Sequence, residues 1–283
     1  MNDRLKDTVF DIFDNGFMRE SMDILTSDPR TGVFAGSWSF VNQLYRFLVP
    51  LATLLIVVAL VLRLIENTMK GTNYTRSDLF KEVALFFIMT YVINNGLVII
   101  SNFFSAGYNF LQKIDSTVLE VDSEGSAESI WNALLEKYGT DYNLDGVMDR
   151  IDNTTSLMFL ITIFPIKIVN FFISMAVKAM SYLYIFKLYV KFLMFPFSLP
   201  ETWRRGYQNG KLFRYLYSFF KLILQGAFMI LALNIGSNII NNVSLQIINS
   251  GNNFAVLLPA YLGVQLSVLI VFFKAEQMSN SLL

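Results

Sequence analysis

Two long stretches of the chain carry no charged side chain. No Asp, Glu, Lys or Arg occurs from Val83 to Gln112 or from Leu222 to Phe273. A soluble helix needs polar residues on its wet face every few positions, whereas about 20 consecutive apolar residues suit a helix that crosses a bilayer. Only 16% of the 283 residues are charged, against about 25% in an average soluble domain. The sequence therefore predicts an all-α, polytopic integral membrane protein.

The apolar runs predict four spans, at about Tyr45–Leu62, Val83–Phe104, Tyr215–Gly236 and Phe254–Phe273. A further apolar stretch, Leu157–Leu199, is too long for one simple crossing. As a single helix it would reach about 64 Å, whereas the hydrocarbon core is about 30 Å thick. It forms either one long helix that projects from the bilayer or a hairpin with its turn near Lys178. No Gly, Pro or Asn lies near Lys178, which favours the single helix.

The distribution of charge between the spans indicates the orientation. The connectors at residues 63–82 and 200–215 are rich in Lys and Arg, which face the cytoplasm in most membrane proteins. Residues 113–153 hold ten acids and three bases, and we expect them outside. A single crossing of Leu157–Leu199 satisfies these charges with five transmembrane helices, an external N-terminus and an internal C-terminus. A hairpin would give six transmembrane helices. We favour five.

The chain accordingly divides into four parts. Residues 1–44 form an N-terminal extracellular or interfacial segment, 45–112 the first two transmembrane helices, 113–156 an acidic extracellular segment, and 157–283 the long helix with the last two spans. In the first part, Val9, Ile12, Phe13 and Phe17 recur at helical spacing. This pattern predicts an amphipathic helix that either lies in the membrane interface or packs on the rest of the protein.

The acidic segment contains "DYNLDGVMDRID", which has the spacing of an EF-hand calcium loop. Oxygen ligands fall at the positions where such loops place them, and Gly146 allows the sharp turn. The last ligand is the shorter Asp in place of the usual Glu, as in dockerin loops, so the site should be weak. The alternative is a solvated acidic turn. The sequence predicts a structural Ca²⁺ site with the ligands Asp141, Asn143, Asp145, Val147 (carbonyl), Asp149 and Asp152.

Several kinds of enzyme are excluded by composition. The chain has no Cys and no His, which rules out catalytic dyads and zinc sites built on those residues. "GYQNGK" at Gly206–Lys211 lacks the glycine spacing and the Ser or Thr of a P-loop. We expect a protein that is not an enzyme.

Polar residues inside the apolar helices are the remaining candidates for function. One face of the penultimate span either packs against other helices or lines a conduit; it carries Ser218, Lys221, Gln225, Asn234 and Asn238. Ala232 and Gly236 are spaced for close helix contact. Lys187 and Lys191 are expected to reach toward the membrane surface.

The residues from Tyr182 to Leu233 resemble the VirB6/TrbL family, the polytopic inner-membrane subunits of type IV secretion and conjugation machines. The features in common are a long helix ending in Phe195-Pro196-Phe197, a basic turn, the entry Arg214-Tyr215-Leu216, and the pair Gln225-Gly226. The small size is similar to that of the Gram-positive versions. The five-span arrangement with a large external segment fits the family, whereas a calcium loop is not part of its pattern.

The resemblance implies a non-enzymatic channel or scaffold subunit in the bacterial cytoplasmic membrane. Its partners would be further copies of itself, other secretion subunits and separate ATPases, and it would help to move DNA or protein. The basic cluster Arg204, Arg205, Lys211 and Arg214 is then a candidate contact for a partner protein or anionic lipid, unless it only sets the topology. The alternatives are a small-solute transporter or ion channel, and a membrane scaffold that recruits partner subunits.

Overall fold

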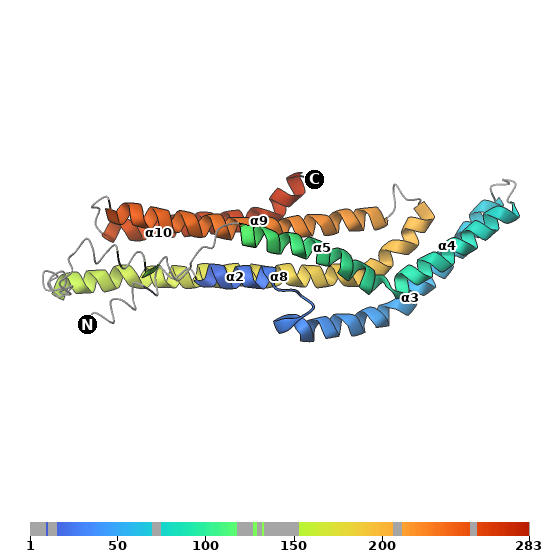
Figure 1. The fold of residues 1–283 in the computed structure, drawn as a ribbon, viewed down its shortest axis with the longest axis horizontal. Coiled ribbons are helices and arrows are strands. Elements are labelled where there is room, and N and C mark those ends of the chain that lie inside the picture. Colours follow the sequence, from blue (N-terminus) through green and yellow to red (C-terminus); the bar gives the residue numbers. More distant parts are fainter. Residues whose placement is uncertain are drawn as a thin grey trace. The chain divides into compact units, whose positions relative to one another are not determined.

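The computed structural model describes residues 10, 16–69, 75–117, 127–128, 132, 153–205, 211–249 and 254–282. All regular elements in these ranges are helical (Figure 1). They are α2 (Gly16–Thr26), the 3₁₀ turn η1 (Gly32–Phe34), α3 (Ala35–Met69), α4 (Arg76–Asn94), α5 (Gly96–Thr117), α8 (Asn153–Arg205), α9 (Lys211–Asn249) and α10 (Phe254–Leu282). The predicted all-α class is confirmed for this part of the chain.

The chain divides into two compact units. The first unit holds Met1–Thr26, Gln112–Leu183 and Gln225–Leu282, and the second holds Ser27–Leu111 and Tyr184–Leu224. Helices α5, α8 and α9 each contribute residues to both units.

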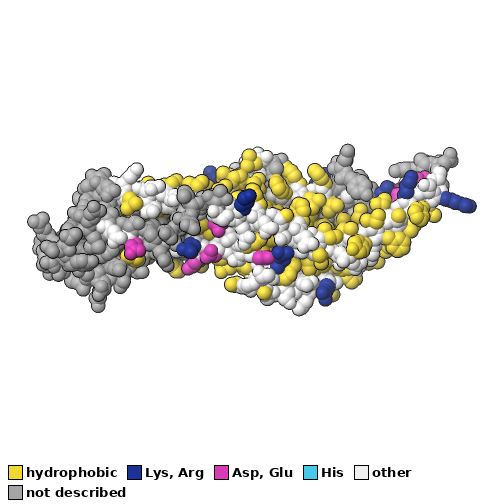
Figure 2. Space-filling view, in the orientation of Figure 1, with side chains coloured by type: hydrophobic (Ala, Val, Ile, Leu, Met, Phe, Trp, Pro, Cys, Tyr) yellow, Lys and Arg dark blue, Asp and Glu magenta, His cyan; other side chains and the backbone are white. Residues whose placement is uncertain are grey.

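Four of the described helices are long and apolar enough to cross a membrane. They are Gly32–Met69, Lys167–Pro200, Lys211–Gln246 and Pro259–Leu282, and the number rises to five if the bent pair α4–α5 counts as one span. Helix α3 carries large exposed apolar side chains along this span, since Phe47 is 77% exposed and Leu51 is 50% exposed. Figure 2 shows hydrophobic side chains covering the α3–α4 hairpin.

The long apolar stretch Leu157–Leu199 lies within one uninterrupted helix. Helix α8 is 53 residues long, with no turn near Lys178. The single helix expected from the absence of turn residues is therefore present, and the hairpin is not.

The second predicted span is not a single straight helix. The stretch Val83–Phe104 is divided between two helices, because α4 ends at Asn94 and α5 starts at Gly96, with a bend of 65° between them, and the pair together is apolar enough for one broken span. Two side-chain amides form hydrogen bonds with carbonyls one turn earlier: Asn94 Nδ2 with Thr90 O at 2.8 Å and Asn95 Nδ2 with Tyr91 O at 3.0 Å. Such local bonds compete with helix continuation, and Gly96 adds backbone freedom at the same place.

Aromatic side chains from four helices form the core of the second unit. Phe192 of α8 is fully buried. Its ring centroid lies 5.4 Å from that of Trp38 in α3, 5.5 Å from Phe104 in α5 and 6.0 Å from Phe219 in α9. In the same unit, an ion pair of 2.8 Å between Arg63 of α3 and the buried Glu82 of α4 links the two helices.

In the first unit, α2 packs against α8. Its apolar side chains Phe17, Met18, Met22 and Leu25 are buried, and Glu20 forms an ion pair with Lys178. For Gly16–Thr26, the structure thus agrees with the packed alternative for the N-terminal helix; Val9, Ile12 and Phe13 lie outside the described residues. Helices α9 and α10 run antiparallel beside each other (Figure 1).

Candidate functional site

The break between α4 and α5 is held from two sides within the second unit. The Tyr45 hydroxyl of α3 donates a hydrogen bond of 3.0 Å to the carbonyl oxygen of Ile93 in the last turn of α4. On the other side, the Phe195 ring of α8 lies so close to Gly96 that a Cβ there would be 2.6 Å from its Cε1 atom. A side chain at position 96 would therefore force Tyr45 or Phe195 to shift, so glycine suits this close packing at the bend.

A bend of this kind matters in a membrane because helix ends carry backbone groups with no intrahelical partner. In hydrocarbon such groups must be satisfied by protein or must line a polar cavity. Here Tyr45 adds a hydrogen bond to the Ile93 carbonyl, which the Asn95 N–H also approaches, and a cavity opens beside the break.

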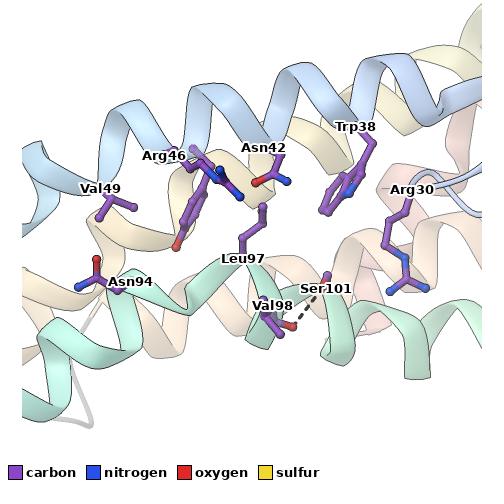
Figure 3. Close-up of a pocket in the computed structure, with 10 residues that line it drawn as sticks. Arg30, Trp38, Asn42, Arg46, Val49, Asn94, Leu97, Val98 and Ser101 are labelled. Atoms are coloured by element: carbon purple, nitrogen blue, oxygen red, sulfur yellow. Dashed lines mark hydrogen bonds between the residues drawn. The ribbon is translucent and has the colours of Figure 1, made fainter.

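The cavity has a volume of about 520 Å³ and lies between the start of α3 and the α4–α5 break (Figure 3). Figure 3 shows Arg30, Trp38, Asn42 and Arg46 on one side, and Asn94, Leu97, Val98 and Ser101 of α4 and α5 on the other. Tyr45 and Val49 complete the lining. The lining includes two guanidinium groups and two side-chain amides but no carboxylate, so the cavity, named here the break pocket, is electropositive.

Arg30 is held in place by the short segment that leads into α3. Its guanidinium forms an ion pair of 2.7 Å with Asp28, and its backbone N–H donates to the same carboxylate at 2.9 Å. These bonds hold the pKa of the Asp28 carboxyl below its ordinary value and raise the pKa of Arg30. The Tyr189 hydroxyl of α8 donates to the Pro29 carbonyl at 2.7 Å. Gly32 has a φ of +59°, a left-handed conformation that favours glycine.

A second polar cluster links α8 to α9 in the same unit. Lys191 Nζ donates a hydrogen bond to Ser218 Oγ, and Tyr215 OH donates to the Lys191 carbonyl at 2.7 Å. Lys191 therefore bonds to the next helix, and its reach toward the membrane surface stays a prediction. For Ser218, the structure therefore shows helix-to-helix bonding.

The other predicted polar residues of α9 lie in different surroundings. Lys221 lies over the Tyr217 ring, 4.7 Å from its centroid. Gln225 and Asn234 are buried, and Asn238 Nδ2 donates to the Asn234 carbonyl at 3.1 Å. Ala232 is buried and Gly236 packs on Val268 of α10, since a Cβ at Gly236 would lie 2.8 Å from Val268 Cγ1. The predicted close helix contact is confirmed at Gly236, and Ala232 is buried on the same helix.

The predicted calcium ligands Asp141, Asn143, Asp145, Val147, Asp149 and Asp152 lie outside the described residues. Of the basic cluster, Lys211 and Arg214 are exposed at the start of α9, whereas Arg204 and Arg205 end α8 and their side chains are not described. The ends of the two helices meet, because the Leu212 N–H donates to Thr202 Oγ1 at 2.7 Å.

Sequence reasoning missed the break pocket and one buried amide. The turn signal for the pocket was Asn94-Asn95-Gly96, which lies inside an apolar run. The amide is Gln265 of α10, which is fully buried and whose Nε2 and Oε1 atoms have no hydrogen-bond partner in the described part of the chain.

Comparisons of the chain with protein-family models, curated proteins and solved structures find no match.

Proposed function

We propose that this protein is a non-enzymatic channel or scaffold subunit of a type IV secretion machine, one that helps to move DNA or protein across a bacterial cytoplasmic membrane. The observation that carries the proposal is that the segments resembling the VirB6/TrbL family pack on each other. Phe195, from the apolar-Pro-apolar element, lies 5.6 Å from Tyr215, of the Arg-aromatic-Leu entry, between ring centroids. Tyr215 also bonds to α8 through the Lys191 carbonyl.

The arrangement of helices is compatible with five crossings. The bent pair α4–α5 would serve as the second span and α8 as the third, with α3, α9 and α10 as the others. With the basic connectors inside, the N-terminus and residues 113–156 would face outward. Cysteines placed at Ser126 and Gln208 of this cysteine-free chain test the orientation. Labelling by a membrane-impermeant reagent at Ser126 alone, in intact cells, supports five spans, and labelling at both positions contradicts it.

The basic turn between α8 and α9 is the proposed contact with the rest of the machine. The bond from Leu212 to Thr202 joins the last turn of α8 to the first turn of α9, and in sequence Arg204, Arg205, Lys211 and Arg214 lie at these two helix ends. Such a cluster suits an acidic surface of a partner protein or anionic lipid. The energy for transfer would come from separate ATPases, since this chain has no P-loop.

The experiment is complementation of a donor strain that lacks the gene. The wild-type protein should restore transfer, co-purify with an assembly ATPase and associate with itself. The double variant Arg204→Glu/Arg205→Glu should abolish transfer while the protein stays in the membrane. The matched control, Lys70→Glu/Arg76→Glu, reverses two charges in the other basic connector and should retain transfer. Equal loss in both would show that the cluster only sets topology, and normal transfer without the protein would contradict the proposed function.

One observation favours a second candidate, a small-solute transporter or ion channel. Broken helices beside polar cavities form substrate sites in many secondary transporters, and the break pocket has this form. Uptake of a solute by vesicles containing the purified protein alone, with no need for a secretion ATPase, would support that candidate instead.

A further inference from the structure

The break pocket has the charge of a site for a monovalent anion. Arg30 and Arg46 contribute two positive charges to its lining. Asp28 forms an ion pair with Arg30 and so neutralises one of these two positive charges. Arg46 has no ion-pair partner among the described residues. The net charge at the pocket is therefore that of one guanidinium, which one phosphodiester group would balance.

The neutral lining groups suit the same ligand. The side-chain amides of Asn42 and Asn94 and the indole of Trp38 are hydrogen-bond donors that line the cavity. Arginine and amide donors together match the several acceptor oxygens of a phosphate group. The break in the helix contributes to this pocket because it turns α5 away from α4 and so leaves room beside Asn94.

The residues around the pocket have the pattern expected at the edge of a membrane. Arg46 is the last charged residue before an apolar run that continues to Leu62. Trp38 and Tyr45 flank the pocket, and such residues are enriched at the membrane–water interface. Immediately beyond Arg46, the exposed side chains of Phe47 and Leu51 offer an apolar surface. A headgroup in the pocket would leave its acyl chains along this face of α3.

We propose that the break pocket binds the phosphodiester headgroup of an anionic phospholipid, with Arg46 as the main charge partner and Asn42 and Asn94 as hydrogen-bond donors. This inference does not depend on the secretion function. A bound lipid would fill the cavity beside the bend and so help to hold α3, α4 and α5 in their bent arrangement.

The experiment is native mass spectrometry of the full-length protein in detergent, titrated with phosphatidylglycerol, phosphatidylcholine or inorganic phosphate. We expect phosphatidylglycerol to be retained in preference to phosphatidylcholine. Arg46→Gln should weaken its apparent affinity about tenfold, the scale of one charged hydrogen bond. The matched control Arg76→Gln removes an exposed arginine at the start of α4, far along the chain from the pocket, and should bind as the wild type does. Asn42→Leu is the second pocket variant and should also weaken binding. It keeps the proposal testable if Arg46→Gln does not fold.

Three results would overturn the proposal. Equal weakening in Arg46→Gln and Arg76→Gln would show general charge attraction only. Unchanged binding in both pocket variants would place the lipid elsewhere. Displacement of phosphatidylglycerol by inorganic phosphate at equal concentration would show a site for the free anion, with no role for the lipid.

Discussion

Tyr45 of α3 donates a hydrogen bond of 3.0 Å to the carbonyl of Ile93, the last buried residue of α4 before the helix bends. One hydroxyl thus connects two helices at the point where α4 stops and α5 begins. The Phe195 ring packs against Gly96 on the same break. The bend therefore depends on contacts from α3 and α8 as well as on the local sequence.

Tyr45→Phe removes this bond and keeps the ring. The carbonyl of Ile93 then loses a partner in a buried place, so we expect the free energy of unfolding to fall by about 1–3 kcal/mol. Thermal unfolding in detergent, followed by circular dichroism, measures the change. Tyr91→Phe is the control, because Tyr91 is 67% exposed, and it should leave the midpoint unchanged. Equal midpoints for Tyr45→Phe and the wild type would show that the bond does not stabilise the bend.

The helices themselves were predictable from the sequence, because apolar run length and the absence of turn residues are local properties. They predicted the uninterrupted α8 through Lys178 and the positions of α9 and α10. The bend at Asn95 was not predicted, because the apolar character of Val83–Phe104 dominated the turn signal of Asn94-Asn95-Gly96. The break pocket could not be predicted, since Arg30 and Arg46 approach Asn94 and Ser101 only once the chain has folded. The bond from Lys191 to Ser218 likewise depends on the register between α8 and α9.

Gly236→Ala should disturb the contact between α9 and α10. The added methyl group would lie 2.8 Å from Val268 Cγ1, and Val is stiff because it is branched at Cβ. We expect a loss of about 1–3 kcal/mol in stability, the usual cost of overpacking, measured by thermal unfolding. The double variant Gly236→Ala/Val268→Ala should recover part of the loss. Gly263→Ala is the control, since no atom lies within 4 Å of a Cβ there. If the double variant were no more stable than Gly236→Ala alone, this contact would be contradicted.

The ion pair between Asp28 and Arg30 predicts how stability depends on pH. The pKa of Asp28 is lowered in the folded protein, chiefly by its side-chain bond to Arg30. The stabilisation is therefore complete above the unfolded value of about 3.9 and is lost as the pH falls through the lower folded value. Unfolding midpoints should be steady from about pH 7 to pH 5 and then fall.

Asp28→Asn should lower the midpoint at neutral pH and flatten the fall in acid. Glu66→Gln is the control, because Glu66 is exposed on α3 and should keep the wild-type profile. If Asp28→Asn showed the same acid dependence as the wild type, other carboxylates would be its cause.

Gln265 is buried in α10 with no partner for its amide among the described residues. An unpartnered amide costs stability, so Gln265→Leu, which keeps a similar volume, should leave the unfolding midpoint unchanged or raise it. Gln277→Leu, at an exposed position, controls for added apolarity. A stable Gln265→Leu protein that fails to restore transfer would indicate that the amide has a role in the proposed transfer function. A large loss of stability would show that the amide is satisfied, for example by water.

The acidic segment provides a test that is separate from the helices. If the loop at Asp141–Asp152 holds calcium, removing the ion leaves several carboxylates close together without a counter-charge, and the folded state loses the binding free energy. The unfolding midpoint should be higher in calcium of about 1 mM than in excess chelator. Asp145→Asn should reduce this difference, while Asp122→Asn, an equal charge change outside the loop, should preserve it. Equal midpoints with calcium and with chelator would remove the calcium site.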